Sequence, residues 1–269
     1  MARGVKRPLA TLALVGLGAL AAQAAARAAR SAPGAEALER TNFHGRTVSL
    51  TGGTALAAAA TATAALGAGS APAAAAALLA GGASGAVGLY DDVVGARPDQ
   101  KASKGFRGHL RALKEGRVTS GMVKIAGVGA AAFGAAALIE AERPARGPIR
   151  RAASVVLGTG VIAGTANLLN LFDLRPGRAL KVGGAMAAGH LLTSAGDRHA
   201  GLVAGPLGAT AALLPADLDE EIMLGDTGAN SLGALIGLAA AARYGIAGRA
   251  VLLAGLAALT AASEKVSFT

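Results

Sequence analysis

The feature that most constrains the fold is the way charged residues leave long apolar stretches between them. Only 16% of the 269 residues are Asp, Glu, Lys or Arg, against about 25% in an average soluble domain. About 20 predominantly apolar residues in a helix, with a range of roughly 17–25, cross the hydrocarbon core of a bilayer. These stretches indicate a membrane protein. The apolar composition of 53% excludes a disordered chain, and the absence of cysteine excludes a disulfide-stapled one. The charge-free stretches are 8–26, 47–90, 125–139, 152–172, 182–196, 199–216, 227–242 and 250–263.

The longest stretch is interpreted as two spans, because residues 67–72 contain the glycines and proline of a tight turn. The shorter stretches are bordered by Lys or Arg, whose side chains can reach the membrane interface. We therefore predict an all-α integral membrane protein, a single domain over 1–269. Its nine transmembrane helices are expected near 8–26, 48–66, 72–90, 119–139, 150–167, 179–195, 199–215, 228–243 and 249–263.

Two alternatives accompany this prediction. One is a soluble all-helical protein with unusually apolar helices. The other concerns the first segment alone, because Arg3, Lys6 and Arg7 before an apolar run that ends near Ala-Gln-Ala also fit a secretory signal peptide. Glycine pairs favour the membrane interpretation, since small residues at four-residue spacing let membrane helices approach closely. The pairs are Gly81/Gly85, Gly160/Gly164 and Gly233/Gly237.

Nine spans bring the polar loops 27–47, 91–118, 168–178 and 216–227 to one side of the membrane, together with the C-terminus. That side carries most of the Lys and Arg, so the positive-inside rule makes it cytoplasmic. We expect a multi-pass protein of the plasma membrane. The net charge of +10 is spread over membrane-flanking loops, without an aromatic stacking platform or recognition helix. Nucleic acid is therefore excluded as a partner, and anionic lipid head groups and phosphorylated ligands are favoured.

Asp91 and Asp92 end the third predicted span. Two adjacent carboxylates at a membrane boundary repel each other, and they suit a divalent cation, a neighbouring cationic side chain, or a role as base or nucleophile. A solvated start of a loop is the alternative. A Gly-flanked basic stretch follows, in which Lys104, Arg107 and His109 are candidates for binding phosphate oxygens. Ordinary positive-inside charge is the alternative explanation there.

Two further polar motifs lie at the ends of predicted spans. Asn167, Asn170 and Asp173 are three residues apart, share roughly one helix face, and are expected to point at the same place; capping of the helix end is the alternative. Gly225-Asp226-Thr227-Gly228 opens the eighth span. Asp226 or Thr227 could be a plain N-cap, and the free amides of such a helix start attract phosphate.

Taken with Asn42-Phe43-His44-Gly45-Arg46 and the following Gly52-Gly53, these motifs occur in the order found in a known family. Over about residues 40–240 the chain resembles the polyprenyl-phosphate N-acetylhexosamine-1-phosphate transferase superfamily, of the phospho-N-acetylmuramoyl-pentapeptide transferase and glycosyltransferase family 4 type. The resemblance implies a helical bundle with a cytoplasmic cleft. It also implies transfer of a sugar-1-phosphate from a UDP-sugar to polyprenyl phosphate, with release of UMP, in cell-envelope glycan assembly.

The resemblance also implies roles for individual residues. Asp226 would hold Mg²⁺, with Mn²⁺ as an alternative ion, and Asp91 and Asp92 would deprotonate or position the lipid phosphate. Lys104 would steady phosphate charge, and Asn167 and Asp173 would line the nucleotide site. The remaining predicted substrate-binding residues are Asn42, Arg46, Gly52, Gly53, Arg107, His109 and Asn170.

Two other functions stay open. A non-catalytic relative that binds polyprenyl phosphate or an envelope-assembly partner is suggested by Asn170 and Met223, which stand where the family has Asp and Phe. The family's late histidine-rich loop is also missing from this sequence. A transporter or channel would need ionisable residues inside the spans, and Lys124 comes closest to that position. A homodimer is the protein partner that we consider.

Overall fold

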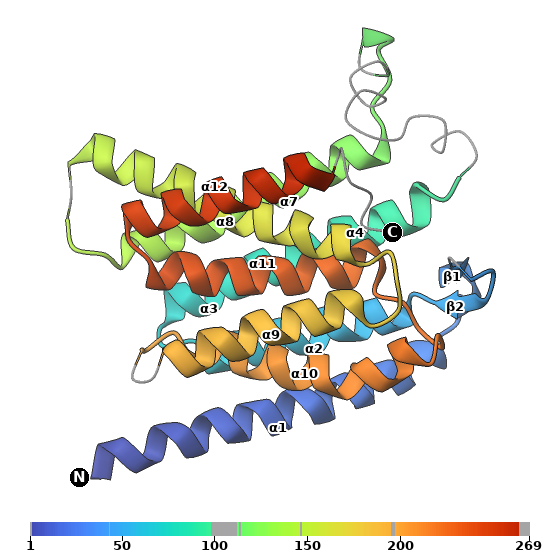
Figure 1. Ribbon diagram of the computed structural model, residues 1–269, viewed down its shortest axis with the longest axis horizontal. Helices are drawn as coiled ribbons and strands as arrows, with labels where there is room; N and C mark the ends of the chain where they lie inside the picture. The colour runs from blue at the N-terminus through green and yellow to red at the C-terminus, as the bar shows by residue number, and fades with distance from the viewer. Residues whose placement is uncertain are drawn as a thin grey trace.

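The structure, a computed structural model, is predominantly helical, with helices over 79% of its length. This content confirms the all-α class expected from the apolar stretches. The helices run along one long axis and pack side by side (Figure 1). The structure describes residues 2–42, 44–97, 112, 114–145, 147–194 and 197–263.

The elements follow the apolar stretches closely along the chain. Helix α1 is followed by a short 3₁₀ turn, η1, and an antiparallel hairpin of strands β1 and β2, which the sequence did not predict. Between α3 and α4 the helix widens into a π-helical segment, η2. The bounds are α1 Ala2–Arg30, η1 Ala35–Leu38, β1 Glu39–Thr41, β2 Thr47–Ser49, α2 Thr51–Gly67, α3 Ala71–Ala77, η2 Leu78–Ala83, α4 Ser84–Val94, α7 Ser120–Ala141, α8 Pro148–Phe172, α9 Arg178–Thr193, α10 Gly201–Leu218, α11 Gly225–Arg243 and α12 Ile246–Ser263.

Six helices of the described chain are long and apolar enough to cross a membrane, which is the pattern of a multi-pass membrane protein. The other three predicted spans are helical as expected and correspond to α2, α9 and α11. Helices α2 and α9 have only 17 and 16 residues, fewer than the about 20 that a span needs. The count of nine spans therefore stays a prediction. The six helices are Pro8–Arg30, Ala71–Val94, Ser120–Ala141, Pro148–Phe172, Gly201–Leu218 and Ile246–Ser263.

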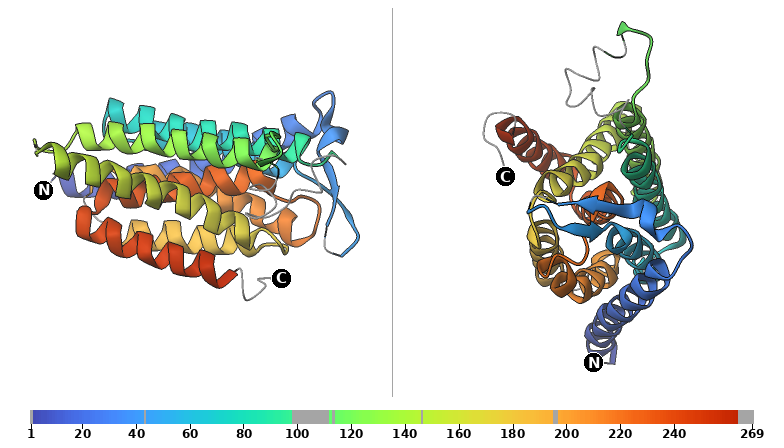
Figure 2. Two further views of the ribbon diagram at one scale, coloured as in Figure 1. Left: turned by 90° about the horizontal axis from the view of Figure 1, so that it is seen from above. Right: turned by 90° about the vertical axis from the view of Figure 1, so that its right-hand side faces the viewer.

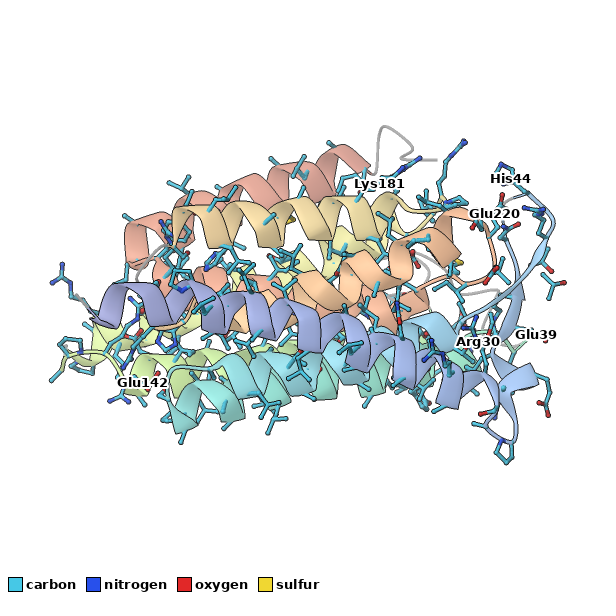
Figure 3. The ribbon with its side chains drawn as sticks, turned by 90° about the horizontal axis from the view of Figure 1, so that it is seen from below. Arg30, Glu39, His44, Glu142, Lys181 and Glu220 are labelled. Atoms are coloured by element: carbon cyan, nitrogen blue, oxygen red, sulfur yellow. The ribbon has the colours of Figure 1, made fainter. Side chains whose placement is uncertain are left out.

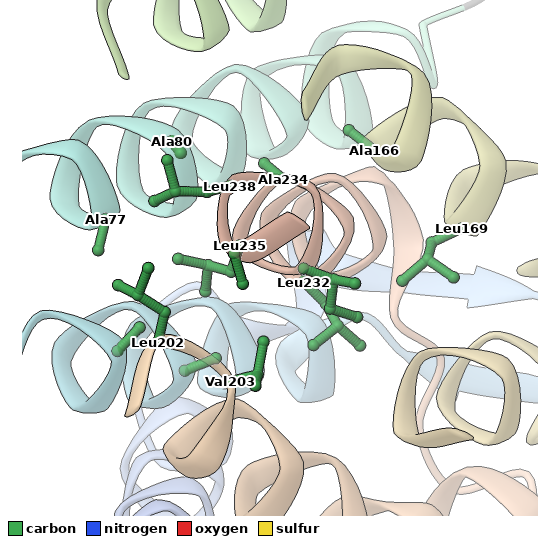
Figure 4. Close-up of a cluster of buried hydrophobic side chains, with 14 of the residues drawn as sticks. Ala77, Ala80, Ala166, Leu169, Leu202, Val203, Leu232, Ala234, Leu235 and Leu238 are labelled. Atoms are coloured by element: carbon green, nitrogen blue, oxygen red, sulfur yellow. The ribbon is translucent and has the colours of Figure 1, made fainter. Parts of the chain in front are cut away.

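Helix α11 occupies the centre of the bundle, and nearly all of its residues are buried. Figure 4 shows Leu232, Leu235 and Leu238 of this helix packed among side chains from the surrounding helices. A Cβ atom at Gly237 would approach the backbone of α8 at Val161 and Ile162 to 2.8–2.9 Å. The small residue therefore sets the close contact between α8 and α11, as the glycine spacing predicted. By contrast, α1 and α12 lie at the periphery (Figure 2).

The β1–β2 hairpin lies across one end of the bundle (Figure 2), which we call the polar end. Its strand β2 also pairs with the loop before α11: Met223 N donates to Ser49 O at 3.0 Å, and Ser49 N donates to Glu221 O at 3.2 Å. The hairpin thereby ties the start of α2 to the start of α11. The described parts of loops 27–47, 91–118, 168–178 and 216–227 all lie at this end (Figure 3).

A buried ionic network holds the opposite end of the bundle. The Arg249 side chain of α12 is fully buried; its Nη1 lies 2.7 Å from Ser154 Oγ and 3.5 Å from Glu140 Oε2. Arg249 Nη2 also donates to Ala241 O at 2.6 Å, near the last turn of α11. Because cations favour helix C-termini, this network anchors α11 at the end remote from Asp226.

Candidate functional site

The candidate site lies at the polar end, where the last turn of α4 meets the first turn of α11. A Cβ atom at Gly88 would overlap the backbone of Asp226, so glycine allows α4 to lie directly against α11. Asp91 and Asp92 follow on α4, and consecutive helix residues point about 100° apart. The two carboxylates therefore face different neighbours.

Asp92 caps α11 from outside that helix. Its Oδ1 accepts a hydrogen bond from Asp226 N at 2.9 Å, and its Oδ2 accepts from Thr227 N at 2.9 Å and Thr227 Oγ1 at 2.6 Å. These amides belong to the first turn of α11 and have no acceptor within the helix. A carboxylate there also matches the positive end of the helix dipole. Asp92 thus fixes the helix turn that carries Asp226.

Asp91 and Asp226 converge on a lysine ammonium group. Lys124 Nζ lies 2.8 Å from Asp91 Oδ2 and 2.6 Å from Asp226 Oδ2. The Lys124 side chain is only 23% exposed, and the two carboxylate side chains are 13% and 19% exposed. One oxygen of each carboxylate is therefore within reach of a single cation. Lys124 was not among the predicted site residues; its position inside an apolar stretch was the available signal, and it was interpreted only as a transporter feature.

Two amide side chains complete the cluster. Asn170 Nδ2 of α8 donates to Asp226 Oδ1 and lies 3.4 Å from Asn230 Oδ1 of α11. Asp226 consequently contacts Lys124 with one oxygen and Asn170 with the other. Asn230 Nδ2 is buried and has no hydrogen-bond partner among the described residues. We refer to Asp91, Lys124, Asn170 and Asp226 as the carboxylate cluster.

The hydrogen bonds of the other two residues of the Asn167–Asp173 motif go elsewhere than to this cluster. Asn167 Nδ2 donates to Thr260 Oγ1 of α12 at 3.2 Å. Asp173 terminates α8 and accepts a backbone hydrogen bond from Gly225. Three residues turn a helix by about 300°, which is about 60° short of a full turn. Each interval of three residues therefore shifts the direction of the side chain by about 60°. Over two steps Asn167 and Asp173 diverge, and only Asn170 reaches Asp226.

Asp173 lines a small cleft beside the cluster, together with Asn42, Asp217, Glu220 and Met223. Its side chain is buried, and burial together with the nearby Asp217 carboxylate raises the pKa of Asp173 well above its usual value. Asp217 Oδ2 accepts from Gly177 N at 2.6 Å, which fixes the turn after α8. The cleft therefore combines a protonatable carboxyl group with amide and carboxylate side chains.

Residues of the first polar loop gather around Glu220 at the edge of this cleft. His44 Nδ1 lies 2.9 Å and Arg46 Nη1 3.4 Å from the Glu220 carboxylate (Figure 3), and Asn42 Nδ2 donates to it. Hydrogen bonds from His44 and Asn42 lower the pKa of Glu220. Asn42 and Arg46, which were predicted to bind substrate, thus join the hairpin to the loop that precedes α11.

Gly52 and Gly53 lie at the start of α2 and permit close packing. A Cβ atom at Gly53 would overlap Leu224 O, and one at Gly52 would lie 2.5 Å from Ile222 Cδ1. The atoms nearest to these two positions belong to Ile222, Leu224 and Gly228, which are not part of the carboxylate cluster. The predicted residues Lys104, Arg107 and His109 lie outside the described residues.

The cluster can supply part of the ligand set of a divalent cation. Within the described ranges, no three His, Cys, Asp or Glu side chains gather as a complete metal site. Mg²⁺ is commonly bound through one or two carboxylates together with phosphate oxygens and waters. Asp91 and Asp226 provide such a pair, while Lys124 provides positive charge at the same oxygens. The arrangement therefore fits a site that is completed by a phosphorylated ligand.

Comparisons with models of known protein families and with curated protein sequences found no match to this chain. The geometry of the cluster and the order of the sequence motifs are accordingly the grounds for a functional proposal.

Proposed function

We propose that the protein is a membrane phosphoglycosyl transferase that moves a sugar-1-phosphate from a UDP-sugar to a polyprenyl phosphate. The observation that carries the proposal is the convergence of three side chains: Lys124 joins Asp91 to Asp226, and Asn170 binds the second oxygen of Asp226. These residues come from three separate motifs of the family that the sequence resembles. They meet at the end of apolar helices, where a lipid phosphate and a water-soluble nucleotide can both arrive.

In the proposed reaction, an oxygen of the lipid phosphate attacks the phosphorus next to the sugar. The bond between that phosphorus and the bridging oxygen breaks, and UMP leaves with the bridging oxygen and its electron pair. The products are a polyprenyl-diphosphate sugar and UMP, so no further co-reactant is needed. Such a transfer depends mainly on positioning and on electrostatic stabilisation of phosphate oxygens.

The described side chains can supply both contributions. Asp226 and Asp91 would hold Mg²⁺ or Mn²⁺, which would offset the charge of the diphosphate when bound. Lys124 places an ammonium group at the same oxygens and Asn170 orients the second oxygen of Asp226. Asp92 acts as a positioning residue, because its carboxylate is already engaged by the amides of α11. Asp173 would face the nucleotide from the neighbouring cleft.

The proposed setting is the plasma membrane with the polar end in the cytoplasm, where UDP-sugars are available. A non-catalytic relative that binds polyprenyl phosphate is the second candidate. The specific observation in its favour is that Lys124 already balances the charge of Asp91 and Asp226 without a metal ion. Both candidates place a lipid phosphate at the polar end.

Release of UMP by the purified protein in detergent-lipid micelles tests the proposal. A panel of UDP-sugars is supplied with polyprenyl phosphate, with and without MgCl₂. We expect magnesium-dependent UMP release that falls at least about 100-fold in Asp226→Asn and Asp91→Asn, the loss typical of an electrostatic contact to the transition state. Asp219→Asn, in the exposed loop before α11, is the control and should keep its activity. Full activity in Asp226→Asn would contradict the assignment, and lipid binding without turnover would favour the second candidate.

A further inference from the structure

A groove separates α2 from the α3–η2–α4 segment on the outside of the bundle. It contains about 670 Å³ of empty space, part of it open to the surroundings. Its rims carry the exposed residues Ala58 and Ala62 of α2 and Gly82 and Ala86 of the opposite segment. A Cβ atom at Gly82 would have only Thr61 Cγ2 within 4 Å, at 3.8 Å. The groove therefore has free space beside Gly82, in the π-helical segment.

The lining offers hydrocarbon contacts rather than polar ones. Alanine, glycine and leucine predominate, and the hydroxyl groups already have partners. Thr54 Oγ1 donates to Thr51 O at 2.8 Å, Thr61 Oγ1 lies 3.4 Å from Ser231 Oγ, and Thr227 Oγ1 donates to Asp92 at 2.6 Å. A polar ligand would therefore find no unmatched hydroxyl group among these three, whereas an apolar chain needs none.

The length and direction of the groove match one leaflet of a bilayer. Its α2 side extends from Thr54 to Ala62 and its other side from Leu78 to Leu89. At about 1.5 Å per residue these sides are about 12 and 16 Å long, roughly half of a hydrocarbon core of about 30 Å. Thr54 and Leu89 lie toward the polar end, and Ala62 and Leu78 lie near the middle of the bundle.

At its polar end the groove reaches the first turn of α11, where Thr227 directly follows Asp226. Thr227 lines the groove and also binds Asp92, the residue that caps the helix turn of Asp226. A lipid of that leaflet has its head group at the polar end and its chain directed toward the middle of the bundle. A chain lying in this groove would therefore place the attached phosphate beside Asp226.

From these observations we propose that the α2–α4 groove holds the first part of the hydrocarbon chain of the polyprenyl phosphate acceptor. This inference rests on the proposed transferase function and adds the path along which the lipid substrate lies.

Photolabelling tests this path. A polyprenyl phosphate with a diazirine near the phosphate is incorporated into phosphatidylcholine vesicles with the full-length protein, irradiated, and the labelled peptides are mapped by mass spectrometry. We expect labelling within residues 54–62 and 78–89. Ala58→Phe and Ala86→Phe should each reduce that labelling at least fivefold. They should raise the KM for polyprenyl phosphate about tenfold, as expected when about two methylene groups lose their burial.

The matched control is Ala24→Phe, the same change at an exposed position of α1, and it should alter neither measurement. Circular dichroism and gel filtration of each variant verify that it is folded. Labels that map elsewhere, or an unchanged KM in folded groove variants that still release UMP, would overturn the groove assignment while leaving the transferase proposal intact. Groove labelling without UMP release from any UDP-sugar would refute the transferase and retain the lipid site. Labelling by a diazirine phosphatidylglycerol that excess polyprenyl phosphate cannot displace would assign the groove to a structural phospholipid and overturn the proposal.

Discussion

Replacement of Asp92 distinguishes a positioning role from a role as general base. In Asp92→Ala, the amides of Asp226 and Thr227 lose their acceptor, together with the Thr227 hydroxyl. Each hydrogen bond to a charged group contributes about 1.5–3 kcal/mol, and water that enters this half-buried place recovers part of that energy. Caps replaced by alanine usually cost about 0.5–2 kcal/mol. We expect a loss of about 2–3 kcal/mol in the free energy of unfolding.

The same substitution should affect function through Asp226. Residues that orient a metal ligand typically change metal affinity or activity by about 10–100-fold. We therefore expect Asp92→Ala to raise the MgCl₂ concentration for half-maximal UMP release and to lower the rate within that range. Asp92→Asn keeps one acceptor oxygen and should recover part of both stability and rate. Unfolding in SDS, followed by circular dichroism, and the UMP assay provide the two measurements.

The refuting result is specific. If Asp92 were the base that deprotonates the lipid phosphate, Asp92→Asn would reduce UMP release to a low residual rate whose pH profile lacks the acidic limb. It would do so with unchanged stability and an unchanged requirement for MgCl₂. That combination would show that the hydrogen bonds from α11 are incidental, and the reasoning from its first turn would be wrong.

Three further perturbations probe other parts of the molecule. Arg249→Met removes the fully buried guanidinium group beside Glu140 and should reduce the free energy of unfolding by about 3–5 kcal/mol. The double variant with Glu140→Gln should cost less than the sum of the two single variants, and additivity in SDS unfolding would count against the network. The pKa of Asp173 is raised in the folded state, so above about pH 4 the folded protein keeps a proton that the unfolded chain has lost. The free energy of unfolding should therefore fall as pH rises from about 4 through the folded pKa. Asp173→Asn should flatten this pH dependence, and an unchanged profile would contradict the role of Asp173. Gly53→Ala should weaken UMP release and stability because its Cβ atom would overlap Leu224 O, whereas Gly16→Ala, with no atom within 4 Å of its Cβ atom, should be neutral; equal effects would refute the packing argument.

The helices of this protein could be predicted because the rare charges mark their ends. Each predicted span corresponds to a helix. The number of helices that cross the membrane also depends on how each helix packs against its neighbours, which the length of an apolar stretch does not describe. Helix α11 illustrates the difficulty, since its burial in the bundle allows Asn230 and Ser231 to lie well inside the helix.

The candidate site could be predicted only in part. Asp91 and Asp226 stand out because carboxylates are scarce near spans. Lys124 did not, because a lysine one turn inside a helix can equally extend to the interface. Its direction depends on the rotation of α7 against α4, which the sequence pattern does not determine. Likewise, Arg249 and Glu140 are 109 residues apart, and no local pattern links them.

The central position of α11 has a consequence for biosynthesis. The helix around which the others pack leaves the ribosome after α2, α4 and α8, and at about 5–20 residues per second it follows them by seconds. Until it arrives, α2, α4 and α8 face an unfilled interior and their small residues have no partner. Insertion of α11 would then close the bundle and bring Asp226 to Asp91 and Lys124 in one step, so a nascent chain that ends before residue 225 should fail to form either the core or the carboxylate cluster.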